Sequence, residues 1–90
     1  MSKKFEVEVS GLEEPVRLNV KESNYANFLS QVAKGNIHEA HRNFLLACID
    51  NAQRDSVKAL MEDDWDLAVT IINPLTDMMG ERRTAAVKKP

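Results

Sequence analysis

The sequence predicts a small α+β domain, with an N-terminal two-stranded antiparallel β-hairpin followed by about four α-helices in a small bundle. Apolar and polar residues alternate over much of residues 4–20, and this period of two is typical of strands that bury one face. From about residue 23 onward, apolar residues recur at helical spacing, which is typical of amphipathic helices. The 90 residues are enough for one domain, and we expect it to span residues 1–80.

The hairpin is predicted from two alternating runs and the turn between them. The apolar members of the runs are Phe5, Val7, Val9, Val16, Leu18 and Val20. Gly11 and Pro15 lie between the runs, and both residue types favour turns. Because a lone hairpin is only marginally stable in water, we expect the helices to cover its apolar face.

The helical part is predicted to contain four helices. Their approximate ranges are 23–34, 37–50, 53–63 and 65–79. Pro74 lies inside the fourth helix, and because proline lacks an N–H and crowds the preceding turn, we expect a kink there or two shorter helices. Residues 81–90 hold four cations and one acid, and we expect them to form a flexible basic tail. The predicted core residues are Phe28, Phe44, Leu45, Val57 and Leu60.

Polar residues with short side chains indicate where the helices begin. Ser23 is predicted to cap the first helix. Asn36, with Glu39 three residues later, resembles a capping box at the start of the second. The last two helices have several candidate caps, which are Asp50, Asn51 or Asp55 for the third and Asp63 or Asp64 for the fourth.

Composition and charge argue against several classes of protein. The net charge is −2 and the pI is about 5.6, whereas a nucleic-acid binder needs a basic face that neutralises phosphates. No apolar run approaches the roughly 18–20 residues that cross a bilayer, and the N-terminal sequence lacks the apolar segment of a signal peptide. The single cysteine permits no intrachain disulfide and fits a reducing compartment. We therefore expect a cytoplasmic protein that binds neither nucleic acid nor membrane.

The segment around His41 and Cys48 holds the residue types of metal and thiol sites. On one helix these two residues lie about 10 Å apart along the axis, too far for a Cys–His nucleophile pair, which needs contact near about 3 Å. His38 and His41 are three residues apart, whereas the metalloprotease signature separates its histidines by four. We therefore expect no enzyme activity, metal or cofactor, with Cys48 a small buried hydrophobe and His41 a core or boundary histidine held by a hydrogen bond. The alternative, a metal or thiol enzyme, predicts bound zinc.

The C-terminal half has features of a protein-binding surface. Methionine-containing faces adapt to varied partners, and the fourth helix has a broad apolar face. If the core leaves this face uncovered, it binds a partner or a second copy of the chain in a homo-oligomer; otherwise it closes the core over the hairpin. Trp65 lies among four acids and is either a half-buried staple, which we favour, or an exposed binding residue. The predicted partner-binding residues are Trp65, Ile72, Leu75, Met78 and Met79.

The order of these parts resembles the small tail assembly chaperones of tailed phages and prophages. The resemblance covers residues 4 to about 80. It is carried by Ser23-Asn24-Tyr25 near the start of the first helix, by AHRNFLLACID at 40–50 and by SVKALMEDD at 56–64. The family pattern is a string like Ala-His-Asn-Phe-Leu, followed by an apolar turn and an acid. This chain departs from the pattern by Arg42, which stands between the histidine and the asparagine.

The resemblance implies a non-enzymatic protein of the host cell cytoplasm that keeps the tape measure protein soluble while tail-tube subunits polymerise around it. Its implied partners are the tape measure protein and the tail tube protein of a phage. A chaperone of a long amphipathic helix needs an adaptable apolar groove and weak, repeated contacts. The alternative function is a small regulatory adaptor or antitoxin-like protein of a mobile element that acts on a host protein, and neighbouring genes would distinguish the two.

Overall fold

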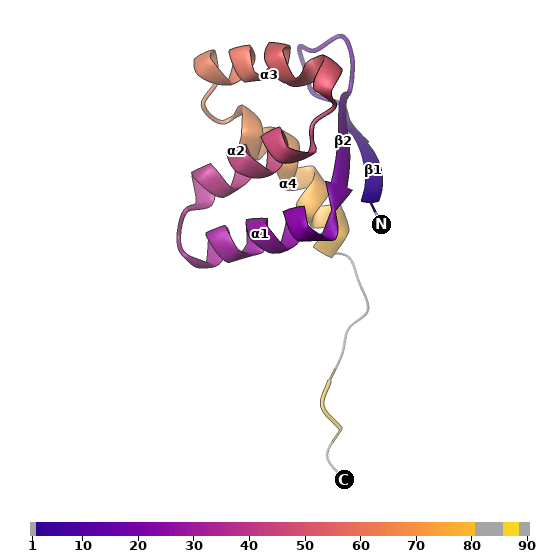
Figure 1. Ribbon diagram of the computed structural model, residues 1–90, viewed down its shortest axis with the longest axis vertical. Coiled ribbons are helices and arrows are strands. Elements are labelled where there is room, and N and C mark those ends of the chain that lie inside the picture. The colour runs from indigo at the N-terminus through magenta and orange to yellow at the C-terminus, as the bar shows by residue number, and fades with distance from the viewer. Residues whose placement is uncertain (1, 81–85, 89–90) are drawn as a thin grey trace.

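The computed structural model describes residues 2–80 and 86–88, and it has the predicted α+β architecture of an N-terminal hairpin followed by four helices (Figure 1). The elements are β1 Ser2–Val7, β2 Val16–Lys21, α1 Glu22–Ala33, α2 Ile37–Cys48, α3 Asn51–Asp63 and α4 Leu67–Gly80. The helix ranges differ from the predicted ones by a few residues at most. Of the tail predicted at 81–90, only residues 86–88 are described, so that prediction lies largely outside the described residues.

The hairpin buries one face, as its alternating sequence predicts. β1 and β2 are antiparallel, with Phe5 opposite Leu18 and Val7 opposite Val16. The apolar side chains of β2 are fully buried, whereas those of β1 are partly buried against the same core. β2 is therefore the inner strand and β1 the outer strand of a two-stranded sheet.

The edge of β2 that faces away from β1 is closed by residues at the start of α3. The backbone N–H of Arg17 donates to Oε1 of Gln53 at 2.8 Å, and Nε2 of Gln53 donates to the carbonyl oxygen of Pro15 at 2.9 Å. The backbone N–H of Asp50 donates to the carbonyl oxygen of Arg17 at 2.9 Å. A side-chain amide has one donor and one acceptor group, as a peptide unit has. The side chain of Gln53 therefore bonds the backbone groups at the start of β2 that a third strand would otherwise bond. The buried amide of Gln53 is thereby satisfied.

The core lies between the inner face of the hairpin and the helices. α2 is at its centre, because it packs against α1, α4 and β2. Phe28 on α1 and Phe44 on α2 pack with their ring centroids 5.0 Å apart, and His41 meets Phe28 edge-on at the same centroid distance. The predicted burial of Phe28, Phe44, Leu45 and Val57 is confirmed.

The prediction that Leu60 belongs to the core is wrong, because its side chain is 39% exposed. α3 contacts the rest of the domain along a narrow stripe, whose buried members are Gln53, Val57 and Met61. These three residues recur every four positions and therefore lie on one face of the helix. Leu60 is adjacent to Met61 but outside this stripe, and the longer, unbranched methionine fills the inward position.

The helix starts differ in part from the predicted caps. α1 begins at Glu22, and its N-cap residue is Lys21 rather than Ser23. The reason is that the backbone N–H of Lys21 donates to Oδ1 of Asn24 at 3.0 Å, so the helix follows directly from β2. Asn36 occupies the N-cap position of α2, but its side chain makes no capping hydrogen bond.

Asp50 proves to be the cap of α3, where its carboxylate accepts a hydrogen bond from the N–H of Ala52 at 3.3 Å.

α4 continues as one helix through Pro74, so the alternative of two shorter helices is wrong. Proline removes the bond to the carbonyl of Thr70. Because Thr70 and Pro74 are both exposed, water can bond this carbonyl. Within residues 2–80 and 86–88, no helix is long and apolar enough to cross a membrane.

We predict that Phe44→Ala destabilises the domain by about 3–5 kcal/mol, because it removes a large aromatic side chain from the core and leaves a cavity. Chemical denaturation followed by circular dichroism would measure the free energy of unfolding. Leu29→Ala, which truncates an exposed side chain on α1, is the control and should change it by less than about 0.5 kcal/mol. Similar losses in the two variants would contradict the assigned core.

Gln53→Ala should destabilise the domain by about 1–3 kcal/mol, because it leaves backbone groups of Pro15 and Arg17 without partners. Gln31→Ala is the matched control, since Gln31 is a half-exposed glutamine whose side chain accepts a hydrogen bond from the side chain of Asn43 at 3.4 Å and bonds no backbone group of the described residues. Hydrogen exchange at the amide of Arg17 provides a local readout. An unchanged exchange rate there in the Gln53→Ala variant would show that the amide bond does not hold β2.

Candidate functional site

The turn between α3 and α4 presents the only tryptophan of the chain to solvent. Trp65 is 78% exposed, so the interpretation of a half-buried staple is wrong and the side chain is an exposed one. The turn itself is held by hydrogen bonds, because Oδ1 of Asp64 accepts from the N–H of Asp66 at 3.1 Å and the carbonyl of Asp64 accepts from the N–H of Leu67 at 3.2 Å. The tryptophan is thus exposed on an ordered backbone.

A histidine connects this turn to the first residues of α2. Nε2 of His38 lies 2.6 Å from the carbonyl oxygen of Trp65, within hydrogen-bonding distance. Ile37, the neighbour of His38, has an exposed side chain. Leu60 is exposed too, and its carbonyl accepts a hydrogen bond from the N–H of Asp64, which joins the end of α3 to the turn. Three exposed apolar side chains therefore belong to segments that meet at this turn. We call these residues, Ile37, Leu60 and Trp65, the Trp65 corner.

Acidic side chains flank Trp65 in sequence and lie on the surface. They are Glu62, Asp63, Asp64 and Asp66, all of them exposed. Protein-binding surfaces commonly combine an apolar centre with polar residues at the rim, and these acids supply exposed charge next to Trp65 in the chain. The negative sign of this rim favours a partner whose apolar segment is flanked by basic residues.

The five residues predicted to bind a partner do not form one surface. Ile72 is 0% exposed and Leu75 is 2% exposed, so these two belong to the core, and their predicted surface position is corrected. The reason is that α4 packs against both α2 and β1, which together cover its broad apolar face. Met78 is exposed and Met79 is half-buried against the core. Trp65 precedes α4 and Met78 lies near its other end, so the exposed members are separated by the length of the helix.

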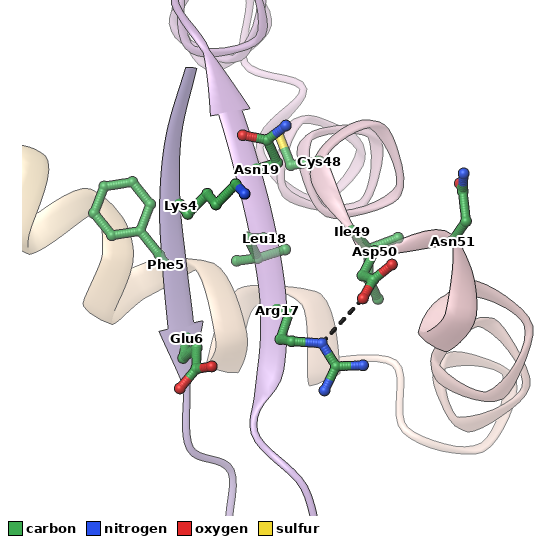
Figure 2. Close-up of a pocket in the computed structure, with 10 residues that line it drawn as sticks. All are labelled: Lys4, Phe5, Glu6, Arg17, Leu18, Asn19, Cys48, Ile49, Asp50 and Asn51. Carbon is green, nitrogen blue, oxygen red and sulfur yellow. Dashed lines mark hydrogen bonds and ion pairs between the residues drawn. The ribbon is translucent and has the colours of Figure 1, made fainter. Parts of the chain in front are cut away.

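A pocket of about 660 Å³ with both polar and apolar lining residues lies beside β2 and the segment between α2 and α3. Figure 2 shows Nε of Arg17 donating to Oδ2 of Asp50 at 3.0 Å, with Lys4 and Glu6 on the neighbouring strand. The Arg17 guanidinium, together with the N–H of Ala52, lowers the pKa of the Asp50 carboxyl below its ordinary value of 3.8. Arg17 is bonded to Asp50, and Lys4 and Glu6 bring one charge of each sign from β1, so the lining does not concentrate charge of one sign for a small ligand.

The histidine and cysteine of the second helix lie as predicted. His41 is buried, and its Nδ1 lies 2.7 Å from the carbonyl oxygen of Ile37. Cys48 is also buried, and burial raises the pKa of its thiol to about 11. In the part of the chain that the structure describes, no three His, Cys, Asp or Glu residues come together as a metal site.

Two features of this site were missed by sequence reasoning. The contribution of His38 was considered only as a metal ligand, and nothing in the local pattern indicates a bond to residue 65. The exposure of Ile37 was missed because it falls on the apolar stripe of α2, although its place at the first residue of the helix was a signal. Side chains in a first helical turn often extend beyond the packed part of a bundle.

Comparisons with known proteins bear on the fold. No family model matches the chain, and no curated protein matches it. Among solved structures it is similar to an uncharacterised protein, rbstp2171, from Bacillus stearothermophilus. The likeness has a TM-score of 0.74 at 18% sequence identity and covers 96% of this chain and 90% of the other. At this identity the likeness shows a shared fold and carries no statement about function.

Asp50→Asn should change the dependence of stability on acid pH. Because the pKa of Asp50 is lowered in the folded state, folding favours the carboxylate. This stabilisation is complete above the unfolded pKa of about 4 and is lost as the pH falls through the folded pKa. The difference in unfolding free energy between wild type and Asp50→Asn should therefore shrink below about pH 4. Urea unfolding over a pH series measures it.

Arg17→Gln provides the control for the Asp50 experiment. The hydrogen bond from Arg17 is the largest cause of the lowered pKa of Asp50, so Arg17→Gln should abolish most of the pH-dependent difference. If the pH-dependent difference in unfolding free energy persists in the Arg17→Gln background, the lowered pKa of Asp50 would be due to its cap of α3 instead.

Cys48 should resist alkylation in the folded protein, because its thiol is buried and out of reach of the reagent. Alkylation also needs the thiolate, and the raised pKa of Cys48 keeps the thiol protonated. Treatment with iodoacetamide at mildly alkaline pH, followed by mass spectrometry, should show modification only after denaturant is added. Rapid modification of the native protein would contradict the buried position.

Proposed function

We propose that this protein is a non-enzymatic protein-binding chaperone of the phage tail assembly type. Its proposed partner is the tape measure protein, whose apolar helical segments it keeps soluble, and the tail tube protein is a second proposed partner. The observation that carries the proposal is Trp65, which is exposed on a turn held by hydrogen bonds. The resemblance of the sequence to such chaperones supplies the identity of the partners.

The order of the turn supports a binding role for Trp65. Covering a large exposed aromatic side chain with a partner contributes favourable free energy to binding. Tryptophan is also enriched among the residues that dominate binding. Binding loses less conformational entropy when the backbone is already fixed, as the bonds from His38 and Asp64 fix it here. The Trp65 corner can therefore bind an apolar helix without first rearranging.

The acidic rim supports a partner of particular chemistry. Four exposed acids beside an apolar centre attract basic residues and repel acidic ones. They also keep the unbound chaperone soluble despite its exposed apolar side chains. The partner segment that fits best is an amphipathic helix with lysine or arginine next to its apolar face.

Trp65→Ala should weaken binding to the proposed tape measure partner by about 2 kcal/mol or more, which is roughly a thirtyfold rise in Kd. Because Trp65 is the only tryptophan, its fluorescence reports on the corner. We expect a shift to shorter wavelength when a tryptophan-free tape measure fragment binds the wild-type protein.

Leu29→Ala is the matched control, since Leu29 is another exposed apolar residue but lies on α1 away from the turn. It should bind as tightly as the wild type. Equal binding by all three proteins would remove Trp65 from the interface. Capture of no phage protein by a folded wild-type chain would favour the alternative of an adaptor that acts on a host protein.

A further inference from the structure

The outer edge of β1 has a defined hydrogen-bonding pattern that follows from its pairing with β2. Arg17 lies opposite Glu6, and its backbone N–H and C=O are bonded away from β1, to Gln53 and Asp50. In an antiparallel pair, opposite residues point their backbone groups either both toward each other or both away. The backbone groups of Glu6 therefore point outward, and so do those of Lys4, two residues earlier.

These outward groups have no partner among the described residues 2–80 and 86–88. No backbone or side-chain hydrogen bond from that part of the chain reaches the N–H or C=O of Lys4 or Glu6. Both side chains are exposed, and the ion pairs of the described residues do not include them. An edge with unpaired backbone groups is a template for one more strand.

We propose that β1 pairs with β1 of a second copy of this chain, antiparallel and across a two-fold axis at Phe5. The pairing places Lys4 of each copy opposite Glu6 of the other and joins the two hairpins into one four-stranded sheet. This inference concerns self-association and does not rest on the proposed function. A symmetric interface of this kind uses the same surface on both copies, so a strand must be complementary to itself.

The charges of β1 select this register. With Lys4 opposite Glu6, both outward-bonding residues of each copy form hydrogen-bonded pairs, and both charge pairs are attractive. A shift by two residues in one direction brings Lys4 opposite Lys4, and a shift in the other direction brings Glu6 opposite Glu6; both of these central pairs are repulsive. The second shift also brings Lys4 opposite Glu8, but Glu8 lies beyond the end of β1. A shift by one residue sets outward-pointing backbone groups against inward-pointing ones and turns side chains to the wrong face. One register therefore remains for the central residues of the strand.

The same register extends the polar face that Figure 2 shows. On that face Glu6 lies opposite Arg17 within the hairpin. In the dimer, Glu6 would stand between Arg17 of its own copy and Lys4 of the second copy. Each carboxylate would then have a cation on both sides, which suits a sheet face in contact with water.

The apolar face of the sheet is continuous in this arrangement. Phe5 of one copy meets Phe5 of the other, and each is packed against its own core. Val7 of the second copy stands opposite Lys3, which lines a pocket of about 390 Å³ together with Tyr25 and Met79. The half-buried apolar side chains of β1 would thus become more buried in the dimer. This burial would stabilise the dimer in addition to the backbone hydrogen bonds.

Two single charge reversals test the register. In Glu6→Lys both outward positions become lysine, and in Lys4→Glu both become glutamate, so each variant should repel itself. We expect each dimer dissociation constant, measured by analytical ultracentrifugation at low salt, to rise by about tenfold or more. A mixture of the two variants should form a heterodimer, because lysines then face glutamates.

The double variant Lys4→Glu/Glu6→Lys and a distant control complete the test. The double variant restores opposite charges across the axis and should dimerise as the wild type does. Glu39→Lys makes the same charge change on an exposed position of α2 and should leave the dimer intact. A wild-type protein that stays monomeric even at millimolar concentration, or a dimer indifferent to the single reversals, would overturn the proposal.

Hydrogen exchange gives a readout at the proposed bonds. The amides of Lys4 and Glu6 should exchange rapidly in dilute protein and slowly in concentrated protein, whereas the amide of Phe5 bonds within the hairpin and should change little. Lys4→Pro removes one outward N–H while leaving the β1–β2 ladder intact, so it should abolish dimers without unfolding the domain. Folded Lys4→Pro that still forms dimers would place the interface elsewhere.

Discussion

The closed edge of β2 is the constraint on which the arrangement of the domain depends. A two-stranded hairpin has little stability alone, and here the inner strand is held on both sides: by β1 along one edge, and by the segment from Ile49 to Gln53 along the other. This segment joins α2 to α3. Its bonds therefore fix the end of the central helix, the start of α3 and the position of the sheet together. Asp50 contributes at three points, through its N–H, its ion pair with Arg17 and its cap of α3.

This closure also determines where the domain has surface left for partners. Once β2 is bonded on both edges, β1 is the sheet's open edge among the described residues. Once α2 and β1 cover α4, the apolar residues Ile72 and Leu75 are removed from the surface. Among the surfaces that stay open are a turn at one end of α4 that carries Trp65 and a strand edge that carries alternating charges. Both are small, and both are ordered by bonds to the rest of the domain.

The hairpin and the helices could be predicted because their patterns are local, with apolar residues at every second position or at helical spacing. The features that the sequence did not predict depend on contacts between distant segments. Gln53 bonds residues 36 and 38 positions away, and a lone polar residue on a helix gives no sign of such partners. Leu60 and Met61 are both apolar neighbours, so only the direction from which α3 meets the core decides which is buried. Trp65 is bulky enough to favour burial, yet bonds from His38 and within the turn fix its backbone with the side chain in solvent.

The two surfaces are compatible with each other in space. The turn between α3 and α4 and strand β1 lie on opposite sides of the domain (Figure 1). In the proposed dimer, the two Trp65 corners would therefore face away from the shared sheet and stay open to a partner. If the proposed function holds, a long partner with repeated apolar segments could occupy the two corners with different segments, and the second contact would gain from the high effective concentration that the first creates. Weak individual contacts then suffice to keep such a partner soluble. Under the proposed function, each corner would release separately, so other proteins could displace this protein stepwise as they assemble on the same partner.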